Sequence, residues 1–241
     1  MRTFVLATML VAAAPAFANP VFRDVLPDWF IPLREAVYEQ ILTVDEIHPI
    51  YRSTVARANS SLSGADLSVM LSRCEYMMGR VYLYEERNSE AAARFDEGMA
   101  YAQRALDIRP SSEAWQMLAE NLSQVIPVRG TAYAMANGLR VERYSRNALG
   151  INSRNAAAQY MIAARWIFAP APFNNIRRGI EMATAILTEA DMEKDDLFNV
   201  YSAIGYAHIQ QRRSNDARPW LLRALEIYPT NKYVQSLLGR T

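Results

Sequence analysis

The sequence predicts an all-α protein in which antiparallel helix pairs stack into a solenoid. Glycine is scarce, and no run of alternating Val, Ile and Thr appears, so the sequence gives no signal for a sheet. A large apolar residue followed by a small one recurs at intervals of 40, 44, 42 and 34 residues. The small residues of this series are Gly79, Ala119, Ala163, Gly205 and Gly239. The recurrence predicts about five helix pairs plus a terminal capping helix.

The composition is that of a folded protein with both signs of charge. The chain has 241 residues, of which 51% are hydrophobic and 21% are charged, and its formal net charge is +1. Such a chain can bury a sizeable core, so it is not expected to be disordered. Its nearly balanced charge also argues against nucleic acid as a partner.

The N-terminus has the pattern of a cleavable signal peptide over residues 1–18. Arg2 is followed by an apolar stretch from Phe4 to Ala14 and then by Ala16-Phe17-Ala18, an A-x-A cleavage site. The alternative is an uncleaved anchor helix, although the apolar stretch is shorter than the roughly 20 residues that span a bilayer. No Cys stands at the predicted mature N-terminus, which is Asn19, so we expect export without a lipid anchor.

Residues 19–66 are predicted to form an N-terminal arm and an atypical helix pair, before a repeat domain over residues 67–241. The arm, Asn19 to Ile31, is too rich in proline for a helix interior and too apolar to be free in solvent. We expect it to lie on the solenoid. The first two helices are predicted near Pro32 to Leu42 and Pro49 to Asn59.

The repeat domain is predicted to have long second helices. In the first repeat the second helix is expected to run almost to Pro110, and in the second repeat it is expected over Thr131 to Leu149, after a loop at residues 127–130. In the third repeat a turn over residues 168–173 leads into a helix that ends near Ala190. Residues 191–196 are expected to be a solvated acidic loop that caps the next helix. A last helix over residues 231–240 would close the stack or join two chains as a homo-oligomer.

The clearest repeat lies between Phe198 and Asn231. Tyr201, Ile204, Gly205 and His208 follow the spacing W-x₂-L-G-x₂-Y, and Ala217, Leu221 and Pro229 occupy the remaining positions of a 34-residue unit. Trp115 to Ala119 repeats the start of this pattern. The chain therefore resembles the tetratricopeptide repeat (TPR) family, and this resemblance implies a TPR-like right-handed α-solenoid that serves as a non-catalytic scaffold for other proteins.

Two narrower resemblances concern the lengthened repeats. Behind a signal peptide they resemble the periplasmic TPR proteins of spirochaetes, a group that includes a subunit accompanying a TRAP-type transporter. The segment from Ala132 to Asn137 and on to Leu149 is also similar to the TPR-like regulators of microtubule dynamics. The first resemblance implies a periplasmic location and a role beside a transport or envelope complex.

The sequence nominates no catalytic residue, cofactor site or metal site. Its two histidines, His48 and His208, are far apart, and no H-E-x-x-H, C-x-x-C or Gly-rich phosphate loop is present. His208 is expected to pack or hydrogen-bond in a helix seam, and His48 to cap a helix or be exposed. The single cysteine, Cys74, is expected to be buried in a helix.

The predicted binding surface is the concave wall formed by the first helix of each pair. In a TPR superhelix this wall is built from fixed positions around the small residue, and from them we predict a partner-binding set. The set is Tyr76, Arg80, Tyr84, Gln116, Glu120, Tyr160, Phe168, Tyr206 and Gln210. The aromatic rings suit a binding groove, because they offer a large contact area at a low entropy cost. The only lysines, Lys194 and Lys232, are not on the wall, which argues against a Lys-based clamp for a peptide C-terminus.

Two functions stay open at this point. In the first the concave groove binds a segment of a protein partner. In the second the solenoid encloses a small apolar ligand as a carrier or sensor. An open groove favours the first and a sealed apolar cavity the second. It also stays open whether the long second helices and the N-terminal arm cover the wall.

Overall fold

The computed structural model describes residue 22 and residues 25–241, and there it consists of eleven helices. The helices are α1 (Ile31–Glu39), α2 (Val44–Ser61), α3 (Gly64–Tyr84), α4 (Asn88–Ile108), α5 (Ser112–Arg129), α6 (Thr131–Ile151), α7 (Ala156–Phe168), α8 (Ile176–Glu189), α9 (Lys194–Gln210), α10 (Ser214–Ile227) and α11 (Lys232–Leu238). In this part of the chain the only strand-type pairing is an isolated bridge between Asn155 and Asp191. The predicted all-α class, with five helix pairs and a terminal helix, is confirmed. The predicted signal peptide and residues 19–21, 23 and 24 of the arm lie outside the described residues.

Small residues let the two helices of a pair approach each other closely, as predicted. A methyl group on Gly79 of α3 would lie 2.4 Å from the Phe95 ring of α4, and one on Gly205 of α9 would lie 2.5 Å from Leu221 of α10. Ala119 and Ala163 are fully buried. The fifth member of the series differs, because Gly239 follows the last helix and is exposed, with no neighbouring helix to approach.

Two of the helix boundaries that differ from the prediction lie at a proline. Helix α2 begins at Val44 instead of Pro49, because Thr43 and Glu46 form a capping box that starts the helix earlier. His48 is therefore inside α2 and half-buried, not at its start. Helix α5 continues through Pro127 to Arg129, and Gly130, with φ of 80°, alone connects it to α6.

The predicted acidic loop before α9 is only partly solvated. Glu193 and Asp196 form a capping box at the start of α9, which confirms the expected acidic cap. Met192 and Asp195, however, are buried. The reason is that Asp195 faces α1, which packs against this end of α9.

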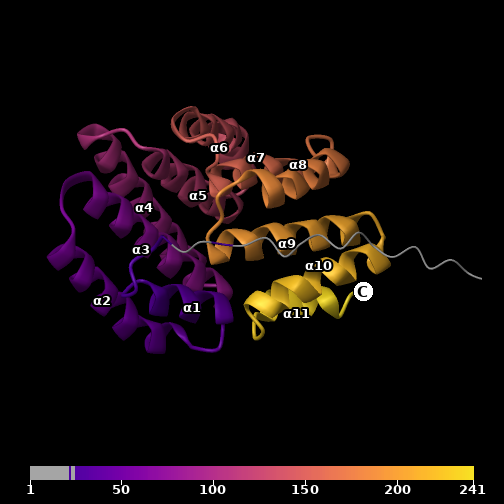
Figure 1. The fold of residues 1–241 in the computed structure, drawn as a ribbon, viewed down its shortest axis with the longest axis horizontal. Helices are drawn as coiled ribbons and strands as arrows, with labels where there is room; N and C mark the ends of the chain where they lie inside the picture. Colours follow the sequence, from indigo (N-terminus) through magenta and orange to yellow (C-terminus); the bar gives the residue numbers. More distant parts are fainter. Residues whose placement is uncertain (1–21, 23–24) are drawn as a thin grey trace, which may run out of the picture.

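The chain curls so far that its first and last helices meet. Figure 1 shows α1 beside the C-terminal helices, and side-chain contacts join them. The Asn231 amide donates to the Tyr38 carbonyl at 2.7 Å, and the Thr230 hydroxyl donates to the Glu39 carbonyl at 2.7 Å. Helix α1 thus links the first helix pair to the last one, across the concave side of the stack.

The remaining burial predictions are confirmed. Cys74 is a free, fully buried cysteine in α3, and burial raises the pKa of its thiol to about 12, so the thiolate is disfavoured. His208 is buried in α9, and burial is the main cause that lowers the pKa of its imidazole. Its Nδ1 has no hydrogen-bond partner. Both residues therefore belong to the packing of helix seams.

Candidate partner-binding wall

The helices predicted to form the concave wall are α3, α5, α7 and α9, and each of them packs against the next in the series. These are the first helices of the second to fifth pairs. All nine predicted wall residues lie on them. Their exposure divides them into three groups. Tyr76 and Gln116 are buried, Arg80, Glu120, Tyr160 and Tyr206 are half-buried, and Tyr84, Phe168 and Gln210 are exposed.

The buried half of the wall lies under α1, which the sequence analysis did not anticipate. Tyr38 of α1 is fully buried, stacks on Tyr228 with ring centroids 4.9 Å apart, and meets Phe198 edge-on at 5.4 Å. The guanidinium of Arg80 also lies over the Tyr38 ring, 4.3 Å from its centroid. Among the described residues, α1, the helix that follows the arm, contacts this half of the wall.

Ion pairs and hydrogen bonds hold α1 against α9. The Arg34 guanidinium, only 1% exposed, is 3.9 Å from a carboxylate oxygen of Asp195. The Tyr38 hydroxyl donates to Asp195 at 3.4 Å, and Lys194 pairs with Glu35 at 2.6 Å. Partly buried charges remain ionised when each has an opposite charge nearby. The contact therefore depends on matched charges as well as on the aromatic packing.

A second set of charges crosses the wall between α3, α5 and α9. Arg73 of α3 pairs with Glu193 at 2.7 Å. Glu120 of α5 lies near this pair, and burial raises the pKa of its carboxyl to about 7, with Arg73 opposing the increase. Burial is also the main cause that raises the pKa values of Glu193 and Asp196. The centre of the wall is therefore polar and charged.

The exposed half of the wall presents four aromatic side chains, which we call the aromatic rim: Tyr84, Phe168, Tyr206 and Tyr233. Phe168 and Tyr206 stack with ring centroids 5.0 Å apart. Tyr84 at the end of α3 is 40% exposed, and Phe168 and Tyr233 are each 45% exposed. Burial raises the pKa of Tyr233 to about 12, and the nearby Tyr206 hydroxyl contributes to the increase. Tyr233, from the terminal helix, is a member that the sequence analysis missed.

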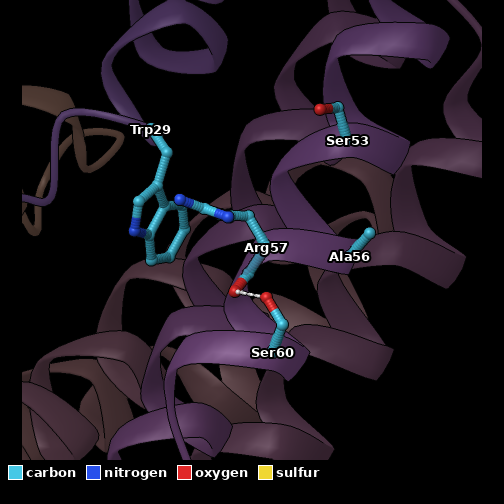
Figure 2. Close-up of a pocket in the computed structure, with 5 residues that line it drawn as sticks. All are labelled: Trp29, Ser53, Ala56, Arg57 and Ser60. Atoms are coloured by element: carbon cyan, nitrogen blue, oxygen red, sulfur yellow. Dashed lines mark hydrogen bonds between the residues drawn. The ribbon is translucent and has the colours of Figure 1, made fainter.

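Two hollows lie away from the wall. The first, of about 500 Å³, is lined by Trp29 and by four residues of α2. In Figure 2 the Arg57 guanidinium extends toward the Trp29 indole, while Ser53 and Ala56 lie farther along α2. Both hollows are open to solvent, and neither is lined by a predicted wall residue.

The second hollow, of about 540 Å³, contains groups that already satisfy one another. Glu75 is buried, accepts a hydrogen bond from the Tyr51 hydroxyl, and pairs with Arg94 at 3.0 Å. His48 Nε2 is 3.0 Å from the Tyr82 hydroxyl at the same place. In the described part of the chain no group of three or more His, Cys, Asp or Glu residues is placed to hold a metal ion.

The residues that sequence reasoning missed are those of α1 and α11. Arg34 and Tyr38 are four residues apart and thus share one face of a helix, while Leu33 and Val37 share another. A short helix with buried residues on both faces has to be covered on both sides. The pattern of Leu33, Arg34, Val37 and Tyr38 could be read from the sequence. It did not indicate which distant helix packs against α1.

These features define a class: an all-α repeat protein of helix pairs that pack in sequence. Within it, residues 198–231, which include most of α9 and all of α10, match the family model for the tetratricopeptide repeat. The chain therefore contains a tetratricopeptide repeat, at the segment where the sequence pattern is clearest.

The comparison with solved structures gives a distant likeness. The chain is similar to the crystal structure of YrrB, described as a TPR protein with an unusual peptide-binding site, at 13% identity and a TM-score of 0.37. The match covers 86% of this chain and 89% of that chain. No protein with a curated description matches the chain in sequence. Among the described residues, no helix is long and apolar enough to cross a membrane.

Proposed function

We propose that the protein is a non-catalytic scaffold that binds a segment of another protein through the aromatic rim of its concave wall. The observation that carries this proposal is the exposure of Tyr84, Phe168 and Tyr233 beside Tyr206, on the face where a TPR-like solenoid binds its partners. Large rings that are partly exposed supply contact area without much loss of side-chain entropy. The tetratricopeptide match over residues 198–231 supports a role in protein interaction.

The alternative of an enclosed small apolar ligand has less support. The centre of the wall contains Arg73, Glu120 and Glu193, and α1 packs over its buried half. An apolar ligand there would exclude solvent from these charged groups and offer them no hydrogen bonds, at a considerable cost in free energy. The aromatic rim, in contrast, faces solvent.

We further propose that the protein works in the periplasm, beside a transport or envelope complex. The signal-peptide pattern of residues 1–18 and the resemblance to periplasmic TPR proteins support this location. Intact mass measurement of protein from the periplasmic fraction should give a mature chain that begins at Asn19. Retention of the full-length chain in the cytoplasm would reject the proposed location and leave the binding role to be tested separately.

The binding role is tested by crosslinking in the native envelope followed by mass spectrometry. Partners recovered with the wild-type protein should be lost when Tyr84→Ala is combined with Phe168→Ala. The matched control is Met135→Ala with Leu139→Ala. It also removes two large apolar side chains, which lie on α6 away from the wall and are more exposed than Tyr84 and Phe168. If the rim variant keeps every partner that the control keeps, the rim is not the binding surface.

A further inference from the structure

Arg80 is a half-buried cation in the wall that has no carboxylate partner. Within the described residues it forms no ion pair, whereas Arg34 and Arg73 on the same side of the stack each pair with an acidic residue. Its Nη1 atom is buried and has no hydrogen-bond partner. A buried donor without a partner costs free energy, so such an atom in a folded protein calls for a physical explanation.

Three tyrosines surround the Arg80 guanidinium. Its carbon Cζ lies 4.3 Å from the ring centroid of Tyr38 and 5.7 Å from those of Tyr76 and Tyr84. The one hydrogen bond from its side chain goes from Nη2 to the Tyr84 hydroxyl, at 2.6 Å. Ring faces stabilise the positive charge without using its N–H groups. The guanidinium is therefore fixed in position and charged, with most of its donors unused.

The arrangement indicates an anion with one negative charge. A planar guanidinium matches a carboxylate, which can accept two parallel hydrogen bonds from it. The Glu120 carboxyl lies near the same tyrosines as Arg80, because both side chains affect the pKa values of Tyr76 and Tyr160. A doubly charged phosphate beside Arg80 would be repelled by ionised Glu120, and none of the ring contacts or ion pairs of the described residues places a second cation beside these tyrosines to compensate. A carboxylate is therefore favoured over a phosphate.

The aromatic rim continues from this position. Tyr84, the exposed member of the three tyrosines, belongs to the rim, and its hydroxyl accepts the hydrogen bond from Arg80, so it links Arg80 to the solvent-exposed rim. Tyr160 is half-buried in α7, and both Tyr233 and Arg80 lie close enough to affect the pKa of its hydroxyl. It therefore lies between Arg80 and the aromatic rim. A bound segment can therefore place an acidic group at Arg80 and apolar side chains on Phe168 and Tyr206.

We infer that Arg80 is the anion-binding residue of the concave wall and that the bound protein segment presents a carboxylate to it. This inference rests on the proposed function and adds the chemistry of the partner. The carboxylate belongs to an Asp or Glu side chain or to a chain terminus, next to apolar residues that pack on the rim.

The test uses a displayed library of random peptides as the probe. Peptides selected on the wild-type chain are retested on the rim variant Tyr84→Ala with Phe168→Ala, on Arg80→Gln and on Arg143→Gln. Arg143 of α6 is a matched control, because it lies over Tyr144 at 5.6 Å but is not on the wall. Peptides that depend on the rim should be enriched in Asp, Glu or a free C-terminus. Arg80→Gln should weaken them roughly tenfold to hundredfold, as expected for hydrogen bonds to a charged group, while Arg143→Gln should not.

Further arms separate the outcomes. Binding that survives amidation of the peptide C-terminus assigns the carboxylate to a side chain, and binding lost on amidation assigns it to the terminus. Arg80→Lys keeps the charge between the tyrosines but loses the two-donor geometry, so it should fold even if Arg80→Gln does not, and should weaken binding. Rim-dependent peptides without an acidic group, or unaffected by Arg80→Lys, would overturn the inference and leave the proposed function standing. A failure to select any rim-dependent peptide would overturn both.

Discussion

The guanidinium of Arg80 lies 4.3 Å from the centroid of the Tyr38 ring, and this contact joins α3 to the helix that closes the solenoid. On its other side Tyr38 stacks on Tyr228, near the end of the chain. One side chain therefore connects the first pair, the concave wall and the last pair. It separates the wall into a half covered by α1 and the exposed aromatic rim, which is the part left for a partner.

We predict that Tyr38→Ala lowers the free energy of unfolding by about 3–5 kcal/mol, the cost typical of removing a large buried aromatic side chain. Tyr38→Phe should cost less, about 1–3 kcal/mol. It keeps the ring contacts but leaves Asp195 and Asn199 without the Tyr38 hydroxyl, which lies 3.4 and 3.1 Å from their side chains. Urea denaturation of the three proteins measures both differences. Equal stabilities would mean that α1 does not hold the ends of the solenoid together.

The close approach of α3 and α4 at Gly79 gives a second prediction. A methyl group at this position would lie 2.4 Å from the fully buried Phe95 ring, so Gly79→Ala should cost about 1–3 kcal/mol through overpacking. Gly138 of α6 is the control, because nothing lies within 4 Å of the same added atom. Gly138→Ala should stabilise the protein by about 0.5–1 kcal/mol, since alanine favours the helix. Thermal denaturation should therefore move the two variants in opposite directions.

The helix pairs could be predicted from the sequence because their cause is local. Gly79 and Gly205 are spaced to meet a large residue on the next helix, and that signal is contained within one repeat. The contact of α1 with α9 has no such signal, because Tyr38 and Asp195 are 157 residues apart and belong to no repeat. The nine wall residues lie on the first helices of their pairs, as predicted, but their exposure depends on neighbours outside their own repeat. Arg80, which contacts Tyr38 of α1, lies 5.7 Å from the centroid of the buried Tyr76 ring, and the buried Gln116 accepts a hydrogen bond from Asn155 at 2.9 Å. Tyr233 was missed because α11 has no partner helix in its own repeat.

The raised pKa of Glu120 predicts how stability depends on pH. Its folded-state pKa is about 7, above the ordinary value of 4.5, because the folded protein buries this carboxyl. The folded state therefore binds the proton more tightly than the unfolded state does. The contribution of Glu120 to stability is greatest below pH 4.5 and declines as the pH rises toward 7, with a slope of up to about 1.4 kcal/mol per pH unit. The raised pKa values of Glu193 and Asp196 act in the same direction.

Glu120→Gln should reduce this slope, because glutamine resembles the protonated carboxyl at every pH. The difference in unfolding free energy between variant and wild type should shift in favour of the variant between pH 5 and pH 8. Glu189→Gln, at an exposed position on α8, controls for the loss of a surface charge. A Glu120→Gln profile parallel to that of the wild type would show that this carboxyl is ionised throughout the range.

The last prediction concerns Asn231, which joins α11 to α1. Its side-chain oxygen accepts from the Val234 N–H at 3.0 Å as the cap of α11, and its amide donates to the Tyr38 carbonyl at 2.7 Å. Asn175 caps α8 in the same way, accepting from the Arg178 N–H at 3.1 Å, but it is exposed. Asn175→Ala should cost about 1 kcal/mol, the value of a cap. Asn231→Ala should cost about 1–3 kcal/mol more, because the Tyr38 carbonyl loses its partner in a buried position.

Hydrogen exchange distinguishes the role of Asn231 in closure from its role as a cap. If closure depends on Asn231, Asn231→Ala should accelerate amide exchange in α1 as well as in α11, although α1 lies nearly two hundred residues away in sequence. Asn175→Ala should accelerate exchange in α8 and leave α1 unchanged. Faster exchange confined to α11 would show that α1 stays in place without this bond. The side chains of Tyr38 and Arg34 would then be sufficient to keep the buried half of the wall covered.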